Sequence, residues 1–212
     1  MTAEEWVPSD GGMRKLRAAL PDCRGCDLWE DASQVVGGEG PVRTRMVLVG
    51  ETPGDHEDKE GHVFVGPAGH LLDKALVAAG IERQDVYLTN AVKHFRFERQ
   101  GKRRIHKTPS AGQITACHPW LARELEIVKP SVVVVMGSVA ARSLLGSSFR
   151  VTHERGKRIE LDTGQPAVAT VHPSAVVRSD NYHRDFEHFV NDLQVAISLI
   201  SGAGLRHSGA AR

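Results

Sequence analysis

The sequence predicts an α/β protein with three layers, in which helices cover both faces of a central parallel sheet of four strands. Four short, mainly apolar runs predict the strands, at residues 46–49, 86–90, 132–136 and 167–171, and the first of them is typical of a strand buried on both faces. Segments with apolar residues at helical spacing alternate with these runs. A chain of 212 residues is long enough for one substantial core, so we expect residues 1–212 to form a single domain with its core at about residues 10–200.

The composition is that of a soluble protein. Hydrophobic residues make up 41% and charged residues 25% of the chain, and the formal net charge is +1. The first residues, MTAEEWVPSDGG, lack the basic and apolar regions of a signal peptide, and no apolar run reaches the ~20 residues that cross a bilayer. We therefore expect a cytoplasmic protein without a membrane partner. Nothing in the sequence indicates an obligate dimer, so we expect a monomer.

A C-x2-C pair follows the first predicted helix. This helix spans residues 12–20 and ends at Pro21, and the pair consists of Cys23 and Cys26. A disulfide is not expected in a cytoplasmic chain, which leaves a metal site, a cluster site or a redox pair. A redox pair of the thioredoxin type would follow a strand, and no strand is predicted before Cys23.

The third cysteine, Cys117, lies on the apolar face of a helix that begins near Ser110. It can be a buried small hydrophobe, or it can complete the C-x2-C pair as a third ligand. A histidine would then supply the fourth ligand, and His94 and His118 are the candidates. The spacing alone does not decide between a zinc ion and an iron–sulfur cluster.

The loop after the first strand is the candidate site. Gly50, Pro53 and Gly54 end the strand, and ligands of open α/β sheets bind beyond the carboxyl ends of strands. Glu51 and Asp55 flank Thr52-Pro53-Gly54, where partial burial can tune a carboxylate for acid–base chemistry. The later acids are expected to form a solvated face around Lys59, and they are Glu57, Asp58 and Glu60. A helix over residues 67–79 follows, with Gly80 after its last turn.

The second and fourth strands also end in polar residues. Asn90 closes the second strand, and its amide can donate and accept together, as reading a nucleobase edge requires, although a turn role is also possible. His172 closes the fourth strand, and Pro173 keeps it out of a helix. The last helix is predicted at residues 181–201, and the tail 202–212 is expected to be disordered.

A basic segment follows Asn90. Phe95 and Phe97 are interleaved with seven cations and one acid, a pattern that offers charges to phosphates and aromatic faces to bases. The alternative is an exposed basic loop without a ligand. The chain has neither of the common glycine-rich phosphate loops, which argues against a nucleotide-cofactor enzyme. The cations are Lys93, Arg96, Arg99, Lys102, Arg103, Arg104 and Lys107.

Four motifs together resemble the uracil-DNA glycosylase superfamily, and most closely its iron–sulfur branch, family 4. They are GETPG from Gly50, FVGPAG from Phe64, TNAVK from Thr89 and HPS from His172. Cys23-x2-Cys26, and Cys117 followed shortly by Pro119-Trp120-Leu121, fit the cluster motifs of that branch. The resemblance implies the superfamily's α/β/α fold, uracil-containing DNA as substrate, single-stranded DNA preferred, and a 4Fe-4S cluster.

The segment KRRIH, Lys102 to His106, resembles the inserted loop of the UdgX class. That class cleaves the uracil bond and stays attached to the abasic DNA through the loop histidine, which implies His106 as nucleophile. Family 4 has a cysteine where this chain has His94, so His94 is implied as the fourth cluster ligand, ahead of His118.

The resemblance also implies roles around the base. Phe64 would stack on uracil, Asn90 would read it, and His172 would bond the oxygen that gains charge. Glu51 would orient or deprotonate His106, and Asp55 is a further catalytic candidate. Thr52 and Gly54 belong to the uracil-binding loop, while Lys102, Arg103, Arg104 and Ser174 would hold DNA or the loop.

Three alternatives remain. In an ordinary turnover family 4-type glycosylase, His106 would be only a loop residue. A non-catalytic single-stranded DNA binding module would keep the fold and the cluster without releasing base. A zinc-bound interaction domain would lack the visible absorbance of an iron–sulfur protein.

Overall fold

The computed structural model describes residues 2–202, and the predicted disordered tail falls outside this range except for Gly202. Its centre is a five-stranded sheet with the order β2-β1-β5-β7-β6. Four of these strands are parallel, as the sequence predicts, and the fifth, β6, runs antiparallel to β7 at one edge. The strands are β1 (Met46–Gly50), β2 (Tyr87–Asn90), β5 (Val132–Met136), β6 (Arg158–Glu160) and β7 (Pro166–Thr170).

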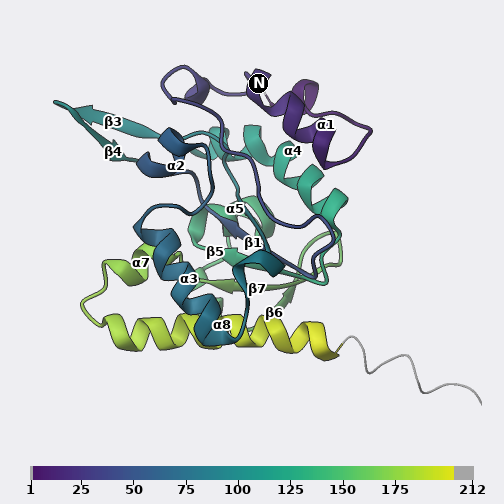
Figure 1. Ribbon diagram of the computed structural model, residues 1–212, viewed down its shortest axis with the longest axis vertical. Helices are drawn as coiled ribbons and strands as arrows, with labels where there is room; N and C mark the ends of the chain where they lie inside the picture. Colours follow the sequence, from purple (N-terminus) through teal and green to yellow (C-terminus); the bar gives the residue numbers. More distant parts are fainter. Residues whose placement is uncertain (1, 203–212) are drawn as a thin grey trace, which may run out of the picture.

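Helices cover both faces of the sheet, which confirms the three layers (Figure 1). One face packs against α1 (Met13–Ala19), α4 (Ala111–Val128) and α5 (Ser138–Leu145). The other packs against α3 (Pro67–Ala79), α7 (Pro173–Val177) and α8 (Tyr182–Gly202). The shorter helices are η1 (Glu4–Trp6), η2 (Leu20–Asp22), η3 (Asp27–Trp29), α2 (Asp55–Glu60), η4 (Arg83–Asp85) and α6 (Val151–Glu154).

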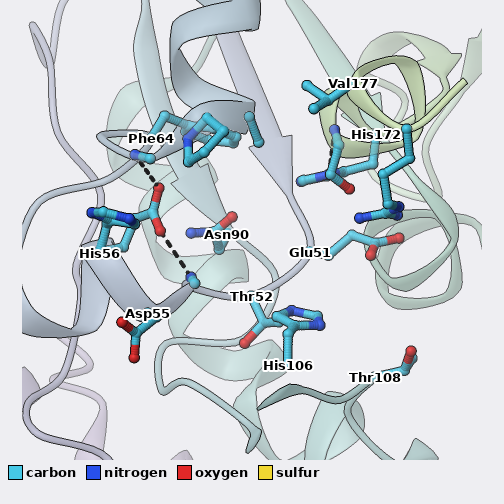
Figure 2. Close-up of a pocket in the computed structure, with 17 residues that line it drawn as sticks. Glu51, Thr52, Asp55, His56, Phe64, Asn90, His106, Thr108, His172 and Val177 are labelled. Atoms are coloured by element: carbon cyan, nitrogen blue, oxygen red, sulfur yellow. Dashed lines mark hydrogen bonds between the residues drawn. The ribbon is translucent and has the colours of Figure 1, made fainter. Parts of the chain in front are cut away.

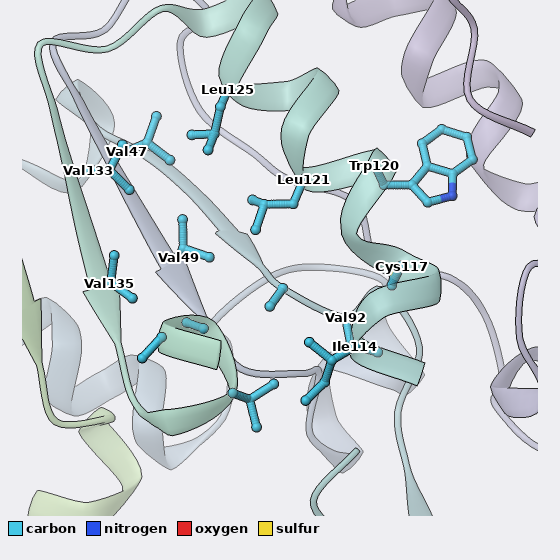
Figure 3. Close-up of a cluster of buried hydrophobic side chains, with 14 of the residues drawn as sticks. Val47, Val49, Val92, Ile114, Cys117, Trp120, Leu121, Leu125, Val133 and Val135 are labelled. Atoms are coloured by element: carbon cyan, nitrogen blue, oxygen red, sulfur yellow. The ribbon is translucent and has the colours of Figure 1, made fainter. Parts of the chain in front are cut away.

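The apolar runs form strands because successive side chains point to opposite faces and both faces are covered. Val47 and Val49 belong to the core on the α4 side, whereas Leu48 belongs to the core on the α3 and α8 side. On α4, Cys117 and Leu121 lie on the face that packs against β1 and β5 (Figure 3). This confirms the predicted apolar face of that helix.

The helix boundaries follow local chemistry. α3 begins at Pro67, whose missing N–H costs nothing in the first turn, and ends at Gly80 in the left-handed conformation with φ 78°. α7 begins at Pro173, and the extended backbone of His172 before it confirms that the proline keeps the histidine out of the helix.

The basic segment is a β-hairpin rather than a loop. Its strands β3 (Phe97–Gln100) and β4 (Arg103–His106) pair antiparallel and bring Phe97 opposite His106. The hairpin projects from the body of the molecule beside α2 (Figure 1). No helix in the part of the chain that the structure describes is long and apolar enough to cross a membrane.

Candidate active site

A cavity of about 490 Å³ opens at the edge where the parallel strands end, within the usual range for small-ligand sites. It brings together residues that lie up to 127 positions apart in the chain, from Glu51 to Arg178. The hairpin closes one side through His106 (Figure 2). The sequence-predicted residues that line it are Glu51, Thr52, Gly54, Asp55, Phe64, Asn90, His106, His172 and Ser174.

Phe64 and Asn90 form one wall of the cavity. Asn90 is 3% exposed at the end of β2, and Phe64 adopts a left-handed backbone conformation with φ 54°. Gly50 lies between them: a Cβ atom there would come within 2.4 Å of the Asn90 Oδ1 and 2.6 Å of the Phe64 Cζ. The glycine therefore lets an aromatic face and an amide approach each other at the floor of the site.

His172 holds one defined tautomer. The backbone N–H of Ser174 donates to its Nδ1 at 3.2 Å, so Nδ1 is an acceptor and carries no proton. Burial lowers the pKa of His172, and the nearby charge of Glu51 opposes this shift. The neutral ring therefore carries its proton on Nε2 and can donate it as a hydrogen bond.

Glu51 is anchored at the start of α5. Its Oε1 accepts from the Val139 N–H at 3.1 Å and from the Ser138 hydroxyl at 3.2 Å. Gly137, with φ 90°, makes room for it, because a Cβ atom there would lie 2.4 Å from that oxygen. Figure 2 shows Glu51 between His172 and His106, and its charge acts on both rings.

His106 reaches the cavity from the last residue of β4. Its ring packs against Phe95 with the centroids 5.8 Å apart. Partial loss of hydration lowers the pKa of His106, while the charge of Glu51 raises it. A neutral imidazole on this side of the cavity can accept a proton or act as a nucleophile.

Arg104 ties the hairpin to α2. Its Nε and Nη1 atoms lie 2.6 Å from carboxylate oxygens of Asp55 and Asp58, and its guanidinium stacks over Phe95 and Phe97. Its side chain is 11% exposed, so it holds the loop rather than reaching for a phosphate. Lys102 and Arg103 lie exposed at the hairpin turn and remain candidates for phosphate contacts.

The prediction of a solvated acidic face is wrong for two of its three residues. Asp58 is fully buried and Glu57 is 8% exposed, whereas Glu60 is exposed as predicted. Asp58 is buried because Arg104 and the Ser33 N–H satisfy its oxygens. Asp55 lines the cavity, but Lys59 and Arg104 each bond one of its oxygens and lower its pKa.

The three cysteines and His94 line one small cavity between η2, η3, the segment after β2 and α4. The Trp120 Nε1–H donates to the Cys23 sulfur at 3.1 Å, and the Lys93 N–H to the Cys117 sulfur at 3.3 Å. Within residues 2–202, no three Cys, His, Asp or Glu side chains are grouped to hold one metal ion. In an iron–sulfur cluster each protein ligand binds its own iron, so the four side chains need not converge on one point.

The protonation chemistry of these residues fits a metal-bound group. Burial lowers the pKa of His94 to about 4, which leaves a neutral imidazole. Burial raises the pKa of Cys117 to about 12, so its thiolate needs a strong positive charge such as iron. His118 lies elsewhere, with its Nδ1 3.1 Å from the Ser143 hydroxyl. The donor set is compatible with an iron–sulfur cluster, and His94 rather than His118 is the histidine that lines the same small cavity as the three cysteines.

Comparison with known proteins shows the family to which the chain belongs. The family model of the uracil DNA glycosylase superfamily matches residues 38–194. The chain belongs to the uracil-DNA glycosylase superfamily. Its relatives in the superfamily include the type-4 uracil-DNA glycosylase of Thermotoga maritima, 36% identical over 91% of this chain and 96% of the relative. The type-4 enzyme of Sulfurisphaera tokodaii is 32% identical over 82% and 80% of the two chains. A type-5 uracil-DNA glycosylase of Pyrobaculum aerophilum is 29% identical over 74% of each.

Several residues that line this cavity were not identified from the sequence. Glu57 follows Gly54 by three residues, the spacing of a helix capping box, and this local signal could have revealed it. Gly66, Pro67 and Ala68 belong to the FVGPAG motif, but the sequence assigns these three residues no role in the site. The others carry no local signal, because only the folded chain brings them to the cavity, and they are His56, Thr108, Val177 and Arg178.

Proposed function

We propose that the protein is a uracil-DNA glycosylase that removes uracil from DNA by hydrolysis and turns over. The observation that carries this proposal is the convergence of Phe64, Asn90, His172 and Glu51 on one cavity. Membership of the superfamily and the likeness to type-4 enzymes over nearly their whole length support it.

Each residue has a role that its geometry allows. Uracil, flipped out or taken from single-stranded DNA, stacks on Phe64, and Asn90 bonds the polar edge of the base. The Nε2–H of His172 donates to the uracil oxygen on which charge develops. These contacts stabilise the base as a leaving anion.

The bond between C1′ and the base nitrogen breaks with its electron pair on uracil, leaving an oxocarbenium-like sugar. Glu51 faces this cation with its carboxylate and orients a water molecule for attack on C1′. Water forms the new C1′–O bond and loses a proton, and uracil gains one. The products are free uracil and an abasic site.

A second candidate function is covalent capture of the DNA through His106. The favouring observation is that His106 lines the same cavity as Glu51 and His172, on a hairpin fixed by Arg104. In this reaction an imidazole nitrogen replaces water: it bonds to C1′, uracil leaves with the electron pair, and Glu51 takes up the proton that the imidazole loses. The likeness to type-4 enzymes supports turnover, so we place capture second.

We further propose that Cys23, Cys26, His94 and Cys117 hold a 4Fe-4S cluster. The cluster would act structurally, because its ligands come from the N-terminal segment, the chain after β2 and α4. Thr52 connects this region to the cavity, since its hydroxyl donates to the His94 carbonyl at 2.8 Å. Purified protein should contain iron and sulfide and absorb visible light. Cys117→Ala should lose both, and the His118→Ala control should keep them.

The deciding experiment mixes the protein with an excess of end-labelled single-stranded DNA carrying one uracil, followed by denaturing electrophoresis. Turnover predicts several uracil molecules released per protein and DNA that breaks at the uracil position after alkali. Capture predicts a retarded band that requires both uracil and His106, and that His106→Ala abolishes. If the assay shows no uracil release and no retarded band, both candidate functions are refuted. The same assay with duplex DNA tests the single-strand preference, and size-exclusion chromatography tests the monomer.

A further inference from the structure

Arg83 holds the loop that carries Phe64, although it lies outside the cavity. It belongs to η4, before β2, and it does not occur among the described residues that line the cavity. Its Nη2 donates to the Val63 carbonyl at 2.9 Å, and its Nη1 donates to the Phe64 carbonyl at 3.4 Å. One planar guanidinium thus contacts two successive carbonyl groups, 20 and 19 residues earlier in the chain.

These two carbonyls belong to the peptide groups on either side of the Phe64 Cα. The orientation of those two planar groups defines the φ and ψ angles of Phe64, so Arg83 acts directly on its backbone conformation. Phe64 has φ 54°, a left-handed conformation that is strained for a bulky side chain and persists only where the surroundings hold it. Strain in the wall of a cavity points to a function for the contacts that maintain it.

Two residues of α3 complete the hold on this loop. An Asp73 carboxylate oxygen lies 2.6 Å from the Arg83 Nη1, the nitrogen that also reaches the Phe64 carbonyl, and so fixes the guanidinium. Gly69 lies so close that a Cβ atom there would be 1.8 Å from the Phe64 carbonyl oxygen. The Phe64 carbonyl therefore has one defined position between η4 and α3.

This backbone conformation places the Phe64 ring at the cavity. The ring edge lies over Gly50, where a Cβ atom would be 2.6 Å from the Phe64 Cζ. The ring stacks towards the His172 ring, with the centroids 6.3 Å apart and an interplanar angle of 28°. Rotation about φ would turn the Cα–Cβ bond and move the ring out of this arrangement. The orientation of the stacking face is thus set from outside the site.

The pair of Arg83 and Asp73 contributes little to the stability of the fold. The two side chains are 36% and 40% exposed, and ion pairs at such positions are weak because water screens them. Replacing Arg83 should therefore leave the protein folded. Its contacts with the carbonyls beside a strained residue serve the wall of the cavity rather than the core.

We propose that Arg83 is a positioning residue that holds the Phe64 ring in the orientation in which uracil stacks on it. The inference rests on the proposed function and deepens it, because recognition of the base then depends on a residue outside the cavity. Stacking of a base on an aromatic ring contributes about 5- to 140-fold to affinity. Without Arg83 the Phe64 backbone can relax to an unstrained conformation, and part of that contribution is lost.

The test compares Arg83→Met and Arg83→Lys with the control Lys74→Met, which removes an exposed cation next to Asp73. Methionine removes both donors, and lysine keeps the charge but lacks the planar fork that reaches two carbonyls. Fluorescence anisotropy measures the binding of two matched single-stranded oligonucleotides. One carries 2′-fluoro-2′-deoxyuridine, whose fluorine disfavours the oxocarbenium-like sugar and so slows cleavage. The other carries an abasic tetrahydrofuran, which has no base to stack.

We expect each Arg83 variant to weaken binding of the uracil oligonucleotide about 5-fold or more and to leave binding of the abasic oligonucleotide unchanged. The control should change neither. Equal weakening on both oligonucleotides would mean that Arg83 only supports the fold or attracts DNA, and would overturn the inference. Wild-type affinities in Arg83→Lys would also overturn it, because the charge alone would then suffice. If Arg83→Met does not fold, Arg83→Lys decides between the same outcomes.

A double-variant cycle tests whether Arg83 acts through the Phe64 ring. Phe64→Leu removes the ring and should itself weaken binding of the uracil oligonucleotide, and adding Arg83→Met should then cause no further loss. Effects that multiply, or a Phe64→Leu variant with wild-type affinities, would contradict the inference. Release of uracil from ordinary deoxyuridine oligonucleotide is measured separately. Wild-type protein that shows these binding effects but releases no base would refute the proposed function and leave the Arg83 inference standing.

Discussion

Replacing Lys93 with methionine tests the buried ion pair behind Asn90. The Lys93 Nζ lies 2.7 Å from a Glu124 carboxylate oxygen, and the two side chains are 1% and 4% exposed. Nζ also donates to the Thr89 hydroxyl at 2.6 Å and to the Asn90 carbonyl at 2.8 Å. Lysine thus satisfies all three of its donors inside the protein and holds the end of β2.

Lys93→Met removes one charge and leaves the other buried. Glu124 would keep its bonds from Thr89 and Gly38, but its charge would lose the compensating cation. Breaking a buried ion pair in this way costs about 3–5 kcal/mol. With a urea m value of about 2 kcal/mol/M, the unfolding midpoint should fall by about 2 M.

The double variant Lys93→Met/Glu124→Gln separates charge burial from packing. Neutralising Glu124 removes the uncompensated charge, so the double variant should lose about 2 kcal/mol less than the sum of the two single variants. Reversible urea unfolding followed by circular dichroism measures the free energies, and visible absorbance checks that any bound cluster is retained. A Lys93→Met loss below about 1 kcal/mol, or additive single effects, would refute this account.

Three further predictions concern the hairpin and the histidines. Arg104→Met, which removes the cation from the buried Asp58, should destabilise the protein by about 3 kcal/mol or more and speed proteolysis within the hairpin, whereas the exposed control Arg103→Met should change neither. Replacing Lys102 and Arg103 together with alanine should reduce the log–log salt slope of single-stranded DNA binding by about 1.4, and an unchanged slope would exclude them as phosphate contacts. Burial lowers the pKa values of His106 and His172 below 6.5 in the folded state, so the folded protein binds fewer protons than the unfolded chain. The free energy of unfolding should therefore fall as the pH drops below 6.5. A urea midpoint that increases when the pH is lowered from 7.5 to 5.5 would contradict this prediction.

Much of the fold follows from local pattern. The apolar run at residues 132–136 is entirely buried because both faces of β5 are covered, and its short length and four valines favour a strand over a helix. Gly80 and Pro173 mark helix boundaries by their backbone chemistry alone. Polar residues placed directly after strands, such as Glu51 and Asn90, meet at one edge because parallel strands share their direction.

Other features depended on partners distant in the chain. The antiparallel edge strand β6 is short and carries exposed charged residues, so it lacks the apolar pattern of the central strands. The interleaved cations and phenylalanines of the basic segment do not determine which residues of β3 and β4 pair with each other. The pairing of Phe97 with His106 follows from a turn at Gly101 and from contacts with α2.

The acidic residues after Gly54 show most clearly which features follow from the sequence and which from the tertiary structure. The sequence by itself determined that a charged stretch follows a buried strand at the ligand edge of the sheet. Only the tertiary structure decided which charges are buried, because Asp58 depends on Arg104, 46 residues later, and Glu57 depends on the Gly66 amide. The free energy of a buried carboxylate is set by the donors that reach it, and those donors are known only once the chain has folded.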